Sequence, residues 1–509
     1  MVGFQFPTYF NSDSQHPLLP YRLLIQNSDM ESLRLWILLS LIVASLFTRS
    51  IYRLYFHPLS KFPGPKLTAA THLHEFYHDV VRNGMFLWEI QKMHEKYGPI
   101  VRINPREIHI KDPYYHEQIY PSGGRKREKD PNFVPLFAAP LSIISTIDHE
   151  HHHFRRGILS GFFSKKSVVS MTPLIQEKLS ILMERFEQAY QDSAVVDLTA
   201  AFCALTGDIV THYTYGQSSD SLRDKDFKNN IRGGILELES ANHLNRFVPS
   251  LIPFIQLMPS WLVARFKPAT AAILGEVTEH SQNALEESSQ EDCINGKQTL
   301  EGMILLSGGT ESPANALSVA AFHLSNDKSI ATKLRTELNP VMGMEAHLVP
   351  LAKLEQLPYL TGVVNEALRL SFGLISRPPR VAPDESLVYQ KYAIPPGTPV
   401  STSSYFMNMD PTIFTDPELF SPERWVLASE RGENLTRFMS AFGKGSRACI
   451  GLNSGYAELY FTIAAMTHHF EFDLYETTQE DIRPFRDRGL PFSKNGHWRV
   501  KAKVSRLIK

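Results

Sequence analysis

A glycine-rich loop near the C-terminus, Phe442–Gly451, constrains this chain more than any other feature. It reads Phe-Gly-Lys-Gly-Ser-Arg-Ala-Cys-Ile-Gly, and an apolar recurrence at helical spacing follows it from Leu452. Gly443 and Gly451 permit backbone conformations and close approaches that residues with a Cβ resist, so the loop can aim its amides at Cys449. Amides near a sulfur and at the start of a helix favour a thiolate. The pattern predicts a loop that presents a thiolate to an iron.

The alternative for a single cysteine in such a loop is a buried structural residue. The full spacing Phe-x-x-Gly-x-Arg-x-Cys-x-Gly disfavours that alternative and resembles the haem-binding signature of the cytochrome P-450 superfamily, a class of thiolate haem proteins. The resemblance implies that Cys449 is the axial iron ligand of heme b. It also implies that the loop residues Phe442, Gly443 and Gly451 hold the cofactor, and that Arg447 faces one of its anionic groups.

A second motif of this superfamily lies upstream. Glu366 and Arg369, in Glu-Ala-Leu-Arg, are one turn apart on the same face of a helix predicted from the apolar run 357–370. Taken alone, a Glu-x-x-Arg is most often an ordinary surface pair. Here Phe-Ser-Pro-Glu-Arg-Trp follows at 420–425, and the resemblance implies that Arg424 completes a buried structural triad with that pair. A buried charge cluster of this kind needs every partner.

The predicted helix from Leu300 to about Leu324 carries an acid and an alcohol where the superfamily has an acid and a threonine. The resemblance implies that Glu311 and Ser312 manage proton delivery to bound dioxygen. Serine keeps the hydroxyl but lacks the methyl group that helps to fix the rotamer, and Thr310 is a second candidate for the hydroxyl. A proline follows at Pro313, and we expect it to unwind the helix locally because it lacks an N–H and clashes with the carbonyl four residues back. A kink that only bends a core helix is the alternative.

The two propionates of a haem need cationic or hydrogen-bonding partners. Besides Arg447, the resemblance implies Arg380 and Arg156 for this role, with His152 in place of the tryptophan that the superfamily has four residues before Arg156. In the run around His152, only His149 and His153 have the spacing of a helical metal pair. A solvated or propionate-facing start of a helix is the favoured interpretation of that run.

The N-terminal region predicts a membrane anchor. Leu35–Phe47 is nearly all apolar, and arginines at 34, 49 and 53 can extend it by snorkelling towards the roughly 20 residues that a span needs. Basic residues follow the segment and acidic residues precede it, which places the remainder of the chain in the cytosol. A cleaved signal peptide is the alternative, but the run starts late and lacks a clear cleavage site. We predict a segment without a readable motif at 1–32, an anchor at 33–55, a Pro-rich hinge at 56–66 and a catalytic domain at 67–509.

Composition agrees with one large catalytic unit. The chain has 509 residues, 43% of them hydrophobic, and a formal charge of −1, so nucleic-acid binding is disfavoured. Cys203, Cys293 and Cys449 are its three cysteines, which argues against a disulfide framework. Strand-like pieces at 100–103 and 107–110 precede a mainly helical region. The resemblance implies a mainly α fold with a smaller β region, the cytochrome P-450 fold, preceded by one anchor helix.

The resemblance implies a monooxygenase that takes electrons from NADPH through NADPH-cytochrome P-450 reductase and inserts one atom of O2 into a lipophilic molecule. The segments 394–400 and 407–411 resemble those of fungal microsomal members that oxidise terpenoid or polyketide intermediates. This resemblance implies a single-pass protein of the endoplasmic reticulum membrane. An apolar pocket is expected to be lined by Ile304, Ser307, Gly308, Ile375 and Phe492. A thiolate-haem isomerase or dehydratase without a reductase, and a haem sensor without turnover, are the alternative functions.

Overall fold

The computed structural model describes residues 19–288, 296–343 and 349–508. The chain divides into two compact units, Met1–Ser60 and Lys61–Lys509. Cys293 and residues 1–18 of the predicted N-terminal segment lie outside the described residues.

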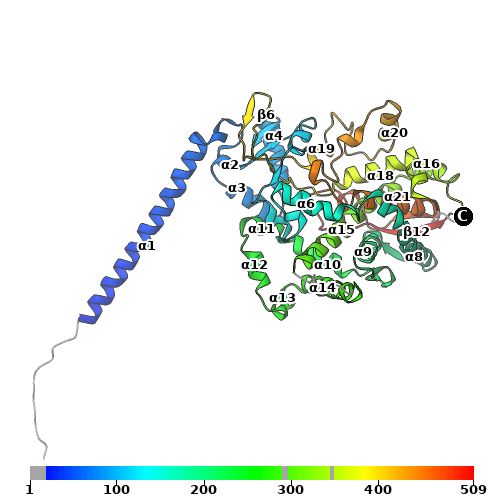
Figure 1. Ribbon diagram of the computed structural model, residues 1–509, viewed down its shortest axis with the longest axis horizontal. Coiled ribbons are helices and arrows are strands. Elements are labelled where there is room, and N and C mark those ends of the chain that lie inside the picture. Colours follow the sequence, from blue (N-terminus) through cyan, green and yellow to red (C-terminus); the bar gives the residue numbers. More distant parts are fainter. Residues whose placement is uncertain (1–18, 289–295, 344–348, 509) are drawn as a thin grey trace, which may run out of the picture. The chain divides into compact units, whose positions relative to one another are not determined.

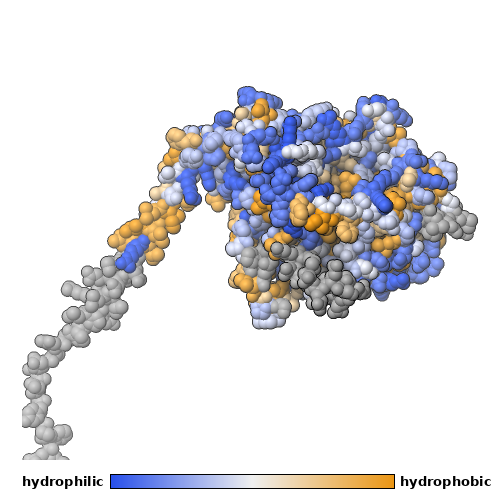
Figure 2. All heavy atoms as spheres, viewed as in Figure 1, coloured by the Kyte–Doolittle hydropathy of each residue, from blue (hydrophilic) through white to orange (hydrophobic). Residues whose placement is uncertain are grey.

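The first unit is one long helix. α1 spans Leu19–Ile51 and continues into a single π-helical turn, η1, at Tyr52–Phe56. Its part Ser32–Phe56 has 25 residues with a mean hydropathy of 1.8, so it is long and apolar enough to cross a membrane, and it buries none of its side chains against protein. Figure 2 shows this stretch as mainly hydrophobic. The helix begins well before residue 33, but the predicted anchor at 33–55 lies within it. Its function as an anchor stays a prediction.

The second unit is mainly helical, as the sequence predicted (Figure 1). Its α-helices are α2 (Lys66–Ala70), α3 (Leu73–Phe76), α4 (Phe86–Tyr97), α5 (His116–Ile119), α6 (His149–Ser160), α7 (Lys165–Ser170), α8 (Thr172–Gln191), α9 (Leu198–Tyr215), α10 (Asn230–Glu239), α11 (Asn242–Phe247), α12 (Leu251–Gln256), α13 (Ser260–Phe266), α14 (Pro268–Ser288), α15 (Gly296–Asn326), α16 (Lys328–Leu338), α17 (Leu351–Leu354), α18 (Pro358–Ser371), α19 (Ser404–Asn408), α20 (Glu423–Glu430) and α21 (Leu452–His469).

Short 3-10 and π turns connect these helices. They are η2 (Pro58–Lys61, across the boundary between the units), η3 (Tyr77–Val81), η4 (Val134–Phe137), η5 (Ile143–Ser145), η6 (Ser221–Arg223), η8 (Leu435–Arg437), η9 (Gly445–Arg447) and η10 (Gln479–Asp481).

The strands are short and form several small sheets. They are β1 (Ile100–Arg102), β2 (Ile108–Ile110), β3 (Glu128–Lys129), β4 (Val195–Asp197), β5 (Arg380–Val381), β6 (Leu387–Tyr389), β7 (Tyr392–Ile394), β8 (Pro399–Ser401), β9 (Phe470–Leu474), β10 (Arg486–Arg488), β11 (Leu490–Phe492) and β12 (Lys501–Leu507).

The largest sheet has the order β1-β2-β8-β5-β3, with β2 and β8 parallel and its other pairs antiparallel. The two predicted strand-like pieces are its β1 and β2, with Ile100 opposite Ile110. The other sheets are β4-β12-β9, β10-β11 and β6-β7. The five-stranded sheet matters for the site, because its pairing of β3 with β5 places Lys129 opposite Arg380.

The core lies where α9, α15, α18 and α21 pack together. α9 is apolar on nearly all sides and is buried along most of its length, as expected for a helix without a polar face. Glycine allows α9 and α15 to approach closely, since a Cβ on Gly309 would lie only 2.6 Å from the Val210 side chain. This packing fixes the rotation of α15 about its axis, and with it the different directions in which Glu311 and Ser312 point.

Candidate active site

The loop around Cys449 is closed by its own backbone. The Cys449 amide donates to the Phe442 carbonyl oxygen at 2.8 Å, and Gly443 has a φ of +64°, in the left-handed region that favours glycine. α21 then begins at Leu452, directly after Gly451. Phe442 packs against Tyr456 of that helix, with ring centroids 5.3 Å apart. The cysteine therefore stands just before a helix start, as the sequence predicted.

The protein alone does not hold Cys449 as a thiolate. Burial deep in the protein raises the pKa of the Cys449 thiol, while the Gly451 amide and the Arg156 guanidinium lower it. Burial has the largest effect on this pKa. The Gly451 amide favours the thiolate, as expected, but does not outweigh burial. The sulfur nevertheless faces open space, since the residue is exposed on its cavity side. A bound metal ion, which deprotonates a coordinating thiol, would supply the missing stabilisation.

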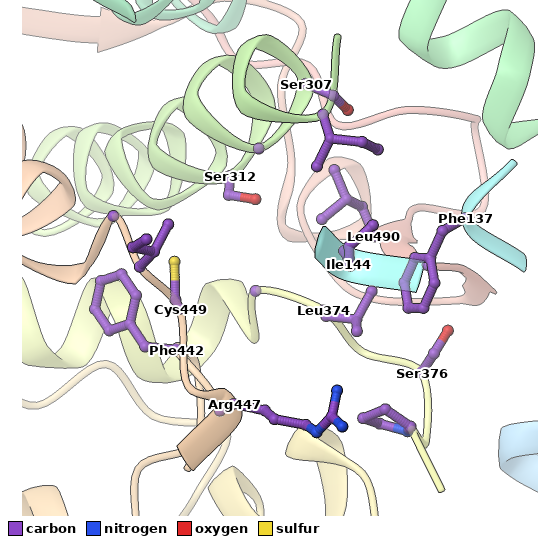
Figure 3. Close-up of a pocket in the computed structure, with 18 of the residues that line it drawn as sticks. Phe137, Ile144, Ser307, Ser312, Leu374, Ser376, Phe442, Arg447, Cys449 and Leu490 are labelled. Atoms are coloured by element: carbon purple, nitrogen blue, oxygen red, sulfur yellow. The ribbon is translucent and has the colours of Figure 1, made fainter. Parts of the chain in front are cut away.

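Cys449 lines a cavity of about 470 Å³. In Figure 3 its sulfur points towards the side of the cavity where α15 presents Ser312 and, farther along, Ser307. Most of the other labelled side chains in the view are apolar: Phe137, Ile144, Leu374 and Leu490.

The expected lining of this cavity is correct for three residues and wrong for two. Ile304, Ser307 and Gly308 line it, whereas Ile375 and Phe492 do not. Leu374, next to Ile375, and Leu490, two residues before Phe492, line the cavity in their place. Phe492 instead packs under the Arg488 guanidinium, 4.7 Å from its ring centroid.

A group of cationic and histidine side chains lines the part of the cavity near the loop. Its members, here called the cationic cluster, are His116, Lys129, His152, Arg156, Arg380 and Arg447. Among the described residues, the cluster forms no ion pair within 4.0 Å of an acid. Arg447 donates to the carbonyl oxygens of Arg127, Thr146, Ile147 and Asp148 at 2.7 to 3.1 Å. Arg156 Nη1 donates to the Ala448 carbonyl oxygen at 2.7 Å, and Arg380 also donates to backbone carbonyls.

Burial and mutual repulsion disfavour these positive charges. The pKa of Arg447 is lowered to about 9, first by burial and then by Arg380. Burial also lowers the pKa values of Lys129, Arg156 and Arg380. His152 has its pKa lowered to about 2 by burial and by the surrounding cations, so its ring is neutral. A cluster of this kind fits the two propionates of a haem, which would pair with cations that have no acid beside them.

α15 presents Ser312 to the cavity but turns its two preceding residues away. Thr310 is fully buried and its side chain lies against Gly207 of α9. Glu311 is buried too, with Oε1 at 3.0 Å from Arg232 Nε and 3.7 Å from the Cys203 sulfur. Contrary to the expected unwinding, α15 remains helical through Pro313. α9 contacts it before the proline, at Gly309 and Thr310, and after it, at Ser318.

Glu366 of α18, itself fully buried, lies at the centre of a charge cluster. Its carboxylate accepts from Arg369 Nε at 2.9 Å and Nη2 at 2.7 Å, and from Arg424 Nε at 3.1 Å. The Ser421 amide at 3.0 Å and Trp425 Nε1 at 2.8 Å complete its partners. Burial alone would raise the pKa of Glu366, but Arg369, Arg424 and these hydrogen bonds outweigh it and lower the pKa. We call these residues the Glu366 cluster.

The comparison with protein families agrees with this arrangement. Residues 63–496 match the family described as Cytochrome P450. The chain belongs to the cytochrome P450 family. Among its relatives are the Cytochrome P450 monooxygenase aflU of Aspergillus parasiticus, 42% identical over 92% of this chain and 98% of the relative, and the Cytochrome P450 monooxygenase TRI4 of Fusarium sporotrichioides, 40% identical over 87% and 89%. The Conidiogenone synthase PchP450 of Penicillium rubens is 41% identical over 90% of this chain and 96% of the relative.

These matches confirm that the chain is a P450 monooxygenase, and the family implies a haem cofactor, dioxygen and a reductase. Two further residues line the cavity of this P450, although no sequence motif indicated them. Lys129 and His116 both line it, and burial lowers the pKa of His116 to about 3. Lys129 stands in a basic run whose spacing carries no signal. Only its strand pairing with Arg380 brings it to the site.

Proposed function

We propose that this P450 inserts one oxygen atom of O2 into a lipophilic small molecule, a terpenoid or polyketide-type intermediate of fungal secondary metabolism. Electrons come from NADPH through NADPH-cytochrome P-450 reductase. The observation that carries the proposal is the Cys449 sulfur facing Ser312 across a largely apolar cavity, in a chain whose relatives are fungal P450 monooxygenases. Conidiogenone synthase, named after a product of small-molecule biosynthesis, supports the substrate class.

The residues that would hold the haem follow from the site. Cys449 would ligate the iron, with Phe442, Gly443 and Gly451 shaping its loop. Arg156, Arg380, Arg447 and neutral His152 would bind the propionates, and we add Lys129 and His116 to that set. When bound, the haem supplies the iron at which dioxygen is reduced and split. The protein supplies the thiolate, the counter-charges and an enclosed apolar surface that keeps water from the reacting atoms.

Proton delivery is assigned to Ser312 and Glu311. The Ser312 hydroxyl lines the cavity and can both accept and donate a hydrogen bond. Glu311, the preceding residue, is held by Arg232, so it must leave that partner or relay protons through water to reach Ser312. Thr310 is the weaker candidate for the hydroxyl, because its side chain packs against α9. α1 would anchor the enzyme in the endoplasmic reticulum membrane by a single pass, with the catalytic unit in the cytosol.

The first test is the carbon monoxide difference spectrum of the reduced, membrane-expressed protein. We expect a thiolate-type Soret band in the wild type and its loss in Cys449→Ser. Labelling with heavy dioxygen, with and without NADPH and reductase, then tests the monooxygenation itself. A folded wild type without that band, or a product without label, would refute the proposal.

A second test concerns the proton route. Ser312→Ala should release more peroxide per NADPH consumed, because the hydroxyl that directs the proton is gone. Thr310→Val, which keeps the buried shape, is the matched control and should leave coupling near the wild-type value. The reverse pattern would transfer the hydroxyl role to Thr310.

A further inference from the structure

One acid faces the cavity without a protein partner. Glu239, the last residue of α10, lines the cavity and is 9% exposed. Its Oε2 is buried and has no hydrogen-bond partner, and among the described residues Glu239 forms no ion pair. A buried polar group without a partner costs roughly 1–3 kcal/mol, so this carboxyl calls for an explanation.

The helix position of Glu239 is one that packing would assign to an apolar side chain. Ile231 and Ile235 precede it at intervals of four residues on the same face of α10, and both are buried in an apolar cluster with α14 and α15. Glu239 continues that stripe to the cavity, where Leu238 also contributes lining. The fold gains nothing from a carboxyl there, so its use must lie in what the cavity contains.

The surroundings of Glu239 determine which partner it suits. Burial, and then the nearby charge of Glu311, raise the pKa of Glu239 well above its usual range, so the group carries a proton and can donate it to an acceptor. Arg488, whose charge acts to lower that pKa, is directed elsewhere: its Nε donates to Asn83 Oδ1 at 3.0 Å. Asn242, also in the lining, already donates through Nδ2 to the Arg488 carbonyl oxygen.

We propose that the Glu239 carboxyl hydrogen-bonds an oxygen atom that the substrate already carries, so that this P450 takes a lipophilic molecule bearing a hydroxyl or carbonyl group. The inference rests on the proposed function for the identity of the cavity as the substrate site. The reaction that supplies the substrate must then be one that leaves an oxygen on the carbon skeleton. Glu239 is a positioning residue, since it orients the skeleton rather than the reacting oxygen.

The test measures probe binding to the full-length holoprotein through the shift of its Soret band. The probes are matched in skeleton: cedrol with cedrene, and farnesol with farnesene. We expect the wild type to bind each alcohol about tenfold more tightly than its hydrocarbon, the effect of one well-formed hydrogen bond in an apolar site. Glu239→Leu should abolish the preference, and Glu239→Gln should keep part of it, because an amide N–H still donates.

Several outcomes would overturn the proposal. One is a wild type that binds neither alcohol more tightly than its hydrocarbon, or that binds no probe at all. Another is an equal preference for the alcohols in the wild type and in Glu239→Leu. Tighter binding of farnesyltrimethylammonium than of farnesol would point instead to a cationic substrate. A purely structural role predicts a lower thermal midpoint for Glu239→Leu, whereas we expect an unchanged or higher one. Should Glu239→Leu fail to fold, Glu239→Met provides the same comparison.

The spectral and labelling tests separate this inference from the proposed function. An alcohol preference that depends on Glu239 in a protein without NADPH-dependent oxygenation would leave the inference standing and refute the function. Labelled product from an enzyme whose alcohol preference does not depend on Glu239 would support the proposed function and refute the inference.

Discussion

The P450 contains two buried groups of charges that differ in one respect. In the Glu366 cluster, the acid has five hydrogen bonds from protein donors and its arginines are paired. In the cationic cluster, Arg380 and Arg447 lower the pKa of Lys129, and Arg380 lowers that of Arg447. The hydrogen bonds that these three side chains donate among the described residues go to carbonyl oxygens. The Glu366 cluster is complete with protein partners alone, whereas we infer that the cationic cluster is completed by an anionic ligand. We therefore expect the same residue types to serve structure in one place and cofactor binding in the other.

Breaking the paired cluster should have the largest effect. Glu366→Ala leaves two buried arginines without their acid, which costs roughly 3–5 kcal/mol, and Arg369→Ala leaves a buried carboxylate. We expect little folded holoprotein from either variant, measured as haem content per purified chain. Lys333→Ala is the control: its pair with Glu423 has side chains 58% and 39% exposed, and such pairs are worth about 0–1 kcal/mol. Normal haem content in Glu366→Ala would show that the cluster is dispensable.

Removing the haem should destabilise the folded protein, because the cationic cluster then has no anionic ligand. Haem-depleted protein is expected to unfold at a lower temperature, since a ligand present at about a hundred times its Kd stabilises by about 2.7 kcal/mol. Pyrophosphate, a multivalent anion, should restore part of the loss. Sodium chloride at equal ionic strength controls for general screening. Equal effects of the two salts on the thermal midpoint would argue against a built anion site.

Removing one cation from the cationic cluster should affect the haem-bound and the haem-free protein differently. Lys129→Met is expected to weaken haem binding about tenfold, which is about 1.4 kcal/mol. It should leave the haem-free protein as stable or more stable, because a buried cation beside Arg380 and Arg447 is lost. Titration of haem and thermal unfolding measure the two effects. Lys126→Met, at an exposed position of the same basic run, should change neither. Destabilisation of the haem-free protein by Lys129→Met would contradict the comparison.

Acid should weaken the two clusters in different pH ranges. The folded protein lowers the pKa of His116 from its usual 6.5 to about 3, so below pH 6.5 the unfolded chain takes up a proton that the folded one does not. The resulting loss of stability reaches about 1.4 kcal/mol per pH unit for one such group. Glu366, whose pKa is lowered from 4.5, contributes stability that is complete above pH 4.5 and is lost as the pH falls through its folded value.

The variant His116→Phe isolates that contribution. Between pH 6.5 and 5.5 its unfolding free energy should fall by about 1 kcal/mol less than that of the wild type. Denaturant titrations at each pH measure the difference. Parallel curves for the two proteins would show that His116 is protonated in the folded state.

How far the sequence predicts the site depends on the separation of its parts. Cys449 and the loop residues lie within ten positions, so their spacing alone indicates a thiolate ligand. Glu366 and Arg369 are one helical turn apart, but whether they are buried depends on Trp425 and Arg424 closing over them. By sequence, Ser312 and Thr310 are both candidates for the hydroxyl role. Only the packing of α15 on α9 turns Ser312 to the cavity and Thr310 to the core.

The sequence by itself determined the family, the thiolate loop, the predominance of helix and the apolar N-terminal stretch, because each is encoded by local spacing or composition. Tertiary structure alone decided that Lys129 joins Arg380, that Leu374 and Leu490 line the cavity, and that the Glu239 carboxyl stands unpartnered within it. These features depend on which side chains meet across elements far apart in the chain. Burial and electrostatic interaction act through that proximity in space, and no local pattern records it.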